Sequence, residues 1–329
     1  MARVVRFHEL GGPDVLRIEE RDVRLPALNE VRIRVKALGI NRAEALLRRG
    51  VYIDQPSLPS GLGTEAAGVV EALGDGVQGL ELGDAVSVVP PSSMAQWPAY
   101  GELAVFPARL VVKHPPSLNW ETAAALWMQY VTAYGALIDI AKLRRNDFVA
   151  ITAASSSVGL AAIQIANSIG ATPIAVTRTG AKRQALLDAG AAHVVVLEEG
   201  DLTVRLNEIA GAEGVRVVFD PVGGPAFEPL TAAMSRGGVL IEYGGLSPEP
   251  TPFPIGNVVA KSLILRGYIM REITNDPARL EAAKVFIMEG LASGALQPVI
   301  AKTFSFEDIV EAHRFLESNE QFGKIVVTL

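Results

Sequence analysis

A stretch of small residues between two apolar segments is the first feature that could do chemistry. Residues 152–171 read TAASSSVGLAAIQIANSIGA, after a strand-like run at 148–151 and with helix-like spacing of the aliphatic side chains. A strand, a tight small-residue turn and a helix N-terminus are the parts of a site for the pyrophosphate of a dinucleotide. Only the last of the glycines usual in such a turn is retained. The predicted pyrophosphate-binding residues are Ser155, Ser156, Ser157, Val158 and Gly159.

The three serines decide whether this turn binds a phosphate. Their side chains are small and offer hydroxyl donors beside the N–H groups at the start of the helix. The alternative is a helix that a serine caps, with no ligand. The place of the turn favours the phosphate, because it follows the first of six predicted strands. The carboxyl end of such a strand is where an open α/β sheet binds nucleotides.

Cations follow the second predicted strand, about 20 positions beyond the turn. They are Arg178, Lys182 and Arg183, and Thr177 precedes them. An acidic residue at the end of this strand bonds the ribose hydroxyls of NAD, whereas NADP sites avoid that charge and present cations. This strand ends without a carboxylate, so we predict NADPH as the cofactor, held in part by Thr177, Arg178 and Arg183. The alternative is that these charges are only solvated residues at the start of a helix.

The composition excludes several classes of function. The chain has 329 residues, which suggests about two domains, and a net charge of −6, which disfavours binding of nucleic acid by charge attraction. It has no cysteine, which removes disulfides, thiolate nucleophiles and every zinc site built on sulfur. The four histidines are scattered without the spacing of a metal site. Because signal-peptide and membrane-spanning patterns are missing, we expect no membrane contact and a cytoplasmic location.

Two different patterns of apolar residues along the chain indicate the elements that position these residues. Up to about residue 118, short apolar runs alternate with turn residues, which predicts barrel-like antiparallel β structure. A long helix is predicted over 119–141, and from there short apolar strands alternate with helices, which predicts an α/β fold with a doubly wound parallel sheet. The terminal strand at 324–329 is expected to complete the first domain. We therefore expect a discontinuous substrate domain, 1–122 and 271–329, around an NADPH-binding domain, 123–270.

Short motifs with a common pattern are spread along the whole chain. They are GINRAE at 39–44, RGVY at 49–52, GTEAAGVV at 63–70, GLELGDAV at 79–86, VTAY at 131–134, DPVGG at 220–224 and FGKIVV at 322–327. Taken together they resemble the medium-chain dehydrogenase/reductase superfamily and, within it, the zinc-free quinone oxidoreductases of the zeta-crystallin-like branch. The resemblance implies a GroES-like β-barrel domain beside the Rossmann domain.

The resemblance also implies chemistry without a metal. Zinc-dependent members carry a cysteine and a histidine where this chain has Asn41 and Thr64. Without a Lewis acid, alcohol oxidation loses its main electrostatic term, but reduction of an electrophilic acceptor remains feasible. NADPH would pass a hydride to a quinone or to the β-carbon of an α,β-unsaturated carbonyl. Metal ligands are therefore not expected.

Family positions assign further candidate residues. Asn41, Tyr52, Met128 and Thr132 are expected near the nicotinamide and the substrate, with Asn41, Tyr52 and Thr132 as catalytic candidates. Tyr52 could donate a hydrogen bond or a proton to the developing oxyanion, or could be only an aromatic wall of the pocket. Thr132 could instead bond its own preceding turn, and Met128 could only pack.

Three more positions are carried over from the family pattern. Tyr243 and Gly244 resemble a segment that passes under the nicotinamide, where glycine permits a close backbone approach, although an ordinary strand-end turn would look the same. Lys324 resembles a position near the cofactor, and a solvent-exposed charge is the alternative. This chain departs from the family at the serine turn and at Leu197, where a tyrosine often stacks on the adenosine.

The sequence also bears on the oligomeric state and on the class of substrate. The apolar edge strand at 262–268 should seek a partner, and the family pairs it across a two-fold axis, so a homodimer is expected. Besides a quinone, enone or enal reductase, two alternatives stay open. One is an enoyl-thioester reductase, which would need a basic entrance for its substrate. The other is an NADPH-binding sensor or structural protein without efficient turnover.

Overall fold

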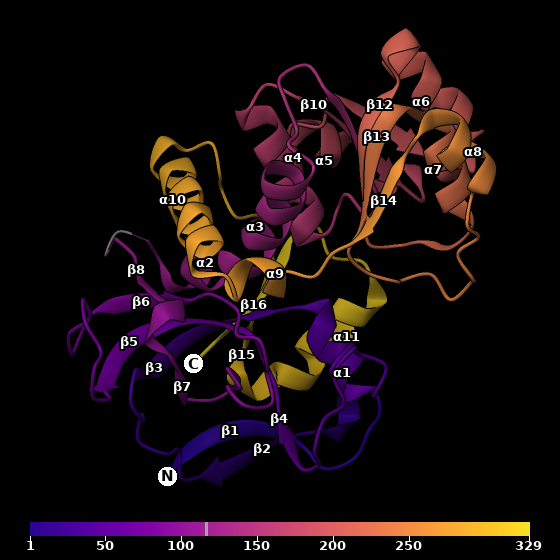
Figure 1. The fold of residues 1–329 in the computed structure, drawn as a ribbon. Helices are drawn as coiled ribbons and strands as arrows, with labels where there is room; N and C mark the ends of the chain where they lie inside the picture. The colour runs from indigo at the N-terminus through magenta and orange to yellow at the C-terminus, as the bar shows by residue number, and fades with distance from the viewer. Residues whose placement is uncertain (116–117) are drawn as a thin grey trace. The chain divides into compact units, whose positions relative to one another are not determined.

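The computed structural model describes residues 1–115 and 118–329. The chain divides into two units, Met1–Met128 with Pro298–Leu329, and Gln129–Gln297. Each is described by itself (Figure 1). Residues 271–297, which the sequence analysis assigned to the substrate domain, belong to the second unit. The reason is local packing, because Arg279 donates to Asp139 at 2.8 Å and the ring of Phe286 packs 5.2 Å from that of Tyr134. The predicted borders of the substrate domain and of the NADPH-binding domain remain predictions, because compact units are not functional domains.

The first unit is built mainly from β-strands. A sheet in the order β15-β16-β3-β5-β6-β8, with β7 also paired to β3, carries most of it, and β2-β1-β4 form a second sheet. The helices are α1 (Arg42–Arg48), α2 (Trp120–Ala124) and α11 (Ile309–Ser318). The strands are β1 (Ala2–Phe7), β2 (Leu16–Arg21), β3 (Glu30–Ile40), β4 (Ser60–Gly61), β5 (Glu65–Leu73), β6 (Ala85–Val88), β7 (Leu103–Pro107), β8 (Val111–Lys113), β15 (Ile300–Ser305) and β16 (Lys324–Thr328).

Strand β3 is the centre of this unit. Its side chains alternate between buried and less buried, as one strand face packs on a core, and Val31, Ile33 and Val35 are buried in one cluster with residues of β5 and β6. The terminal strand β16 pairs antiparallel with the end of β3, with Ile325 opposite Ile40. The terminal strand thus joins the main sheet of the first unit, and the pairing brings Lys324 beside residues that follow β3.

The second unit contains a six-stranded sheet that is parallel throughout. The order β11-β10-β9-β12-β13-β14 is the doubly wound order, so the predicted α/β fold is confirmed, and the strand order reverses between β9 and β12. The strands are β9 (Phe148–Ile151), β10 (Thr172–Thr177), β11 (His193–Val196), β12 (Val215–Asp220), β13 (Met234–Glu242) and β14 (Ile264–Gly267). The helices that flank the sheet or follow it are α4 (Ser157–Ser168), α5 (Arg183–Asp188), α6 (Leu202–Ala210), α7 (Phe227–Ala233), α8 (Ile255–Lys261), α9 (Arg271–Thr274) and α10 (Pro277–Ser293).

The single helix predicted over 119–141 is wrong, because the segment is broken. It forms α2, then α3 (Trp127–Tyr134), and ends in a wider π-helical turn, Gly135–Ile140. At the break, Ala125 has φ −101° and ψ 22°. The N–H of Met128 donates to the buried carboxylate of Glu65 at 3.1 Å instead of continuing the helical ladder. No helix among the described residues is long and apolar enough to cross a membrane.

Candidate functional site

The loop between β9 and α4, residues 152–156, is called the phosphate loop below. Its last residue caps α4, because the hydroxyl of Ser156 accepts the N–H of Gly159 at 3.1 Å. A Cβ on Gly159 would lie 2.6 Å from the carbonyl oxygen of Ala154, so glycine is needed for the close approach of helix and loop. The first N–H groups of a helix have no partner inside it. The loop therefore has the cap that the alternative predicted. It also lies at a helix start, whose N–H groups are the donors that a phosphate needs.

Cations gather beside this loop. The ammonium of Lys182 lies 3.4 Å from the hydroxyl of Ser155, and Arg178 is exposed at the end of β10. Arg183 forms an ion pair with Glu199, a carboxylate that follows β11 and that the sequence analysis did not consider. Lys182 and Arg178 thus supply positive charge at the carboxyl ends of β9 and β10, while the charge of Arg183 is partly offset.

Asp220, at the end of β12, holds the base of the phosphate loop. It is fully buried and accepts the hydroxyl of Thr152, the first residue of the loop. It also accepts the N–H groups of Val222 at 2.9 Å and Gly223 at 3.0 Å. The Asp220 carboxylate therefore connects the loop after β9 with the loop after β12. The strand order reverses between these two strands, and this is where doubly wound folds bind nucleotides.

Tyr243 and Gly244 follow β13 directly. The ring of Tyr243 stacks on that of Phe219, with centroids 4.1 Å apart, and its hydroxyl is buried. A Cβ on Gly244 would lie 2.7 Å from the carbonyl oxygen of Pro221, so this position also requires glycine. Both residues lie at the same sheet edge as the phosphate loop, as expected for residues that contact one dinucleotide.

In the first unit, a buried polar cluster forms around Glu44. Asn41 caps α1, and its backbone N–H donates to the Glu44 carboxylate, as in a capping box. The same carboxylate accepts the hydroxyl of Thr64 at 2.7 Å and that of Tyr100 at 3.1 Å. Burial raises the pKa of Glu44, and the Thr64 hydroxyl, the charge of Lys324 and the hydrogen bonds from Asn41 oppose the shift. The cluster fixes the side chain of Asn41, which also donates to Thr64 at 3.1 Å.

Lys324 supplies the positive charge of this cluster. Its ammonium lies 2.6 Å from Oδ1 of Asn41 and 2.6 Å from Oε2 of Glu65. The side chains of Lys324 and Glu65 are both fully buried. The alternative of a solvent-exposed lysine is therefore wrong, and its predicted role near the cofactor stays a prediction.

The residues at the family's metal position do not fit zinc. Asn41 and Thr64 offer an amide and a hydroxyl, whereas catalytic zinc is held by thiolate, imidazole or carboxylate. The amide oxygen of Asn41 is already occupied by an ammonium, whose charge would repel a divalent cation. Within residues 1–115 and 118–329, no group of three or more His, Asp or Glu side chains is arranged to hold a metal ion.

The predicted catalytic residues belong to both units. In the first unit, Asn41 is in direct contact with Lys324, which was predicted to bind the cofactor. Tyr52 follows α1 in the first unit, where it is partly buried against the core. Thr132 lies on α3 in the second unit, with 6% of its surface exposed.

Three acids with buried carboxyl groups were not among the predicted site residues. Glu44, Glu65 and Glu242 each had a signal, since each is a charged residue inside or beside an apolar run. Such residues are almost never fully buried unless they have partners. Glu44 also stands three residues after Asn41, the spacing of a capping box.

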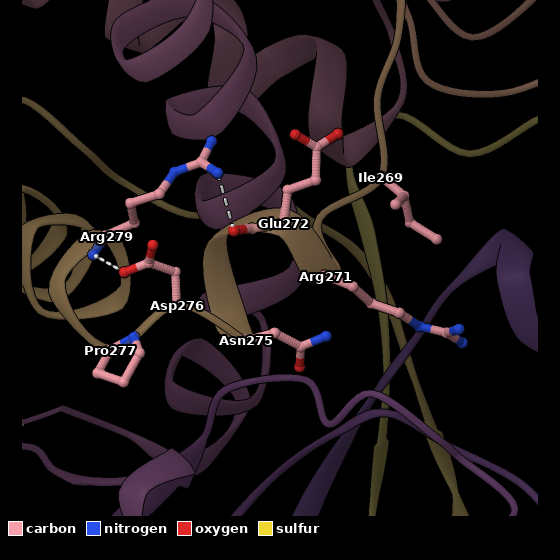
Figure 2. A pocket seen from close by; sticks show the side chains of 7 residues that line it. All are labelled: Ile269, Arg271, Glu272, Asn275, Asp276, Pro277 and Arg279. Carbon is pink, nitrogen blue, oxygen red and sulfur yellow. Dashed lines mark hydrogen bonds between the residues drawn. The ribbon is translucent and has the colours of Figure 1, made fainter.

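A surface hollow around α9 holds none of the predicted site residues. It is lined by Ile269, Arg271, Glu272, Asn275, Asp276, Pro277 and Arg279. Its polar groups serve the fold (Figure 2): Asp276 caps α10 by accepting the N–H of Arg279 at 3.1 Å, and Arg279 donates to the backbone of Glu272 at 3.1 Å. We therefore assign no ligand to it.

Comparisons with known proteins agree with this geometry. Residues 27–116 match the family described as Alcohol dehydrogenase GroES-like domain, and residues 157–284 match Zinc-binding dehydrogenase. The chain is 34% identical to Quinone oxidoreductase 1 of Escherichia coli, covering 98% of each, and 30% identical to Quinone oxidoreductase of Homo sapiens, covering 100% of this chain and 98% of the relative.

Solved structures give the same result. The structure of E. coli quinone oxidoreductase complexed with NADPH matches all of both chains with a TM-score of 0.91 at 33% identity. A Pseudomonas syringae quinone oxidoreductase matches all of both chains with a TM-score of 0.91 at 28% identity. The chain belongs to the quinone oxidoreductase family of the medium-chain dehydrogenase/reductase superfamily.

Proposed function

We propose that this protein is an NADPH-dependent reductase that transfers a hydride to a quinone without a metal ion. The observation that carries the proposal is the sheet edge where a capped helix start, close-approach glycines and two cations surround the strand-order reversal. Relatives of 30–34% identity over their full length, named quinone oxidoreductases, support the same activity. An enoyl-thioester reductase and a protein without turnover are not favoured.

When bound, NADPH supplies the hydride. In our proposal residues 155–159 bind the pyrophosphate, and Arg178 with Lys182 pairs with the 2′-phosphate. Asn41 orients the reacting groups, since its side chain is fixed by Thr64, Glu44 and Lys324. A quinone that accepts a hydride becomes an anion, and Tyr52 donates a hydrogen bond to that oxygen. Tyr243, Gly244 and Thr132 line the nicotinamide in this proposal.

The first test is NADPH consumption by the purified protein in EDTA, with a quinone and a 2-alkenal offered in separate reactions. We expect turnover of the quinone, because its carbonyls accept a hydride without a Lewis acid. The alkenal tests the finer proposal that enones and enals are also reduced. Consumption that EDTA abolishes and zinc restores would contradict a metal-independent reaction.

We also propose a homodimer formed along β14. This strand is the end of its sheet, and Ile264 on it is 55% exposed. Phe253, Ile255 and Val259 nearby are 66–73% exposed, so one contiguous segment presents unusual apolar area. Such an edge pairs readily with a second copy. The predicted cytoplasmic location remains a prediction.

Substituting Ile264→Arg should therefore convert the dimer to a monomer. Light scattering after size exclusion should give twice the chain mass of 34.9 kDa for the unchanged protein and that mass for the variant. The control is Val204→Arg, since Val204 is 52% exposed on α6 of the same unit. An unchanged protein that elutes as a monomer, or a variant that stays dimeric, would contradict the proposed interface.

A further inference from the structure

Two carboxyl groups stand side by side at the carboxyl edge of the parallel sheet. Asp220 on β12 and Glu242 on β13 are register partners, so their side chains project from the same face. Asp220 accepts three hydrogen bonds, from Thr152, Val222 and Gly223. Both carboxyl oxygens of Glu242 are buried, and no side chain among the described residues donates a hydrogen bond to them. The backbone N–H of Gly244 favours the charged form of Glu242, but it is the weakest of the influences on this group. The two acids therefore have very different surroundings.

An ionised Glu242 is unfavourable in this position. A buried carboxylate without a side-chain donor or a counter-charge loses its hydration, and a second negative charge beside it raises the free-energy cost. A proton on Glu242 removes both problems, because the acid then donates to the neighbouring carboxylate of Asp220. Burial, followed by the charge of Asp220 and this hydrogen bond, raises the pKa of Glu242 to about 9.

The other neighbours of Glu242 do not replace the proton. On β14 the opposite residue is Gly267, and the adjacent Arg266 is paired with Glu272. Next along the chain is the phenol of Tyr243, whose pKa is raised well above its usual value by burial and by both acids. Asp220 is thus the charged group that acts on Glu242.

We propose that Glu242 is a positioning residue that shares a proton with Asp220, and that loss of this proton weakens NADPH binding through the Asp220–Thr152 hydrogen bond. This inference rests on the proposed function. Thr152 is the first residue of the phosphate loop, and the next residue, Ala153, has a φ of 45°, a conformation that residues other than glycine rarely adopt. A second charge beside Asp220 would disturb the group that holds the loop. It would also repel a dinucleotide whose phosphates are anionic.

The test measures NADPH affinity between pH 7 and 10 for the unchanged protein and for Glu242→Gln, which keeps the shape but cannot ionise. Calorimetry in two buffers of different ionisation enthalpy counts the protons taken up on binding. For the unchanged protein we expect the Kd to rise about twofold at pH 9 and about tenfold at pH 10, with up to about one proton taken up per NADPH. For Glu242→Gln both the rise and the uptake should vanish. The control is Glu289→Gln, an exposed acid on α10, which should behave as the unchanged protein.

A second measurement, the melting temperature as a function of pH, needs no cofactor. A carboxyl group whose pKa is raised by folding binds more protons in the folded state between pH 4.5 and about 9, so stability falls as pH rises through this window. The melting temperature of Glu242→Gln should therefore exceed that of the unchanged protein by a gap that widens from pH 7 to pH 9.

The outcomes separate this inference from the proposed function. NADPH binding at pH 7 with parallel pH curves for the two proteins would overturn the inference alone. Absence of NADPH binding at pH 7 in both proteins would overturn the proposed function, and the inference with it.

Discussion

Replacing Lys324 with methionine is expected to lower the free energy of unfolding by about 3–5 kcal/mol. The ammonium is fully buried and lies 2.6 Å from the carboxylate of Glu65, which is also fully buried. Removing the lysine leaves Glu65 charged inside the protein, where the N–H of Met128 still donates to it at 3.1 Å. A buried carboxylate without a counter-charge costs far more than the pair contributes. Urea unfolding followed by circular dichroism measures the loss.

Two companion variants show whether the unpaired charge is the cause. The double variant Lys324→Met with Glu65→Gln should recover most of the lost stability, because it removes both charges. Lys113→Met breaks a partly exposed pair with Asp84 at 2.8 Å in the same unit and should cost less than about 1 kcal/mol. Equal losses for Lys113→Met and Lys324→Met, or no recovery in the double variant, would show that burial of the pair is not what stabilises this cluster.

The second unit was largely predictable because its signals are local. Most of the six strands contain a short apolar run, and a parallel sheet buried on both faces requires such runs. Gly159 could also be interpreted from sequence, since its reason is a steric approach within five residues of chain. The predicted helix over 119–141 failed because the competing group, Glu65, lies more than 60 positions away. Local propensity carries no information about such a distant acceptor.

The sequence predicted candidate site residues but not the network of charges that connects them. The resemblance pointed to Asn41 and Lys324 separately, and their direct contact depends on the pairing of β16 with β3. The acid pair of Asp220 and Glu242 depends on the register of two strands separated by a helix. Arg183 was predicted as a cofactor ligand from its spacing, and its pairing with Glu199 follows only from the neighbouring strand β11. In each case long-range pairing decides the partner, and spacing along the chain does not.

The cations beside the phosphate loop are expected to decide between NADPH and NADH. Substituting Arg178→Ala together with Lys182→Ala should raise the Kd for NADPH by about 10- to 100-fold, because hydrogen bonds between charged groups contribute about 1.5–3 kcal/mol. The Kd for NADH should change by less than about threefold, since NADH lacks the 2′-phosphate. Fluorescence titration with both cofactors at one fixed ionic strength measures the two changes. Arg205→Ala, which removes an exposed cation of α6, should change neither.

Arg183 and Glu199 refine this expectation. Because Glu199 pairs with Arg183, the substitution Arg183→Ala alone should weaken NADPH binding less than Arg178→Ala does. Glu199→Gln frees the guanidinium of Arg183 and removes a negative charge, so it should strengthen NADPH binding and leave NADH binding nearly unchanged.

Equal weakening of NADPH binding and NADH binding in the Arg178 and Lys182 variants would contradict recognition of the 2′-phosphate. It would show instead that these cations act on the loop itself, through the contact of Lys182 with Ser155.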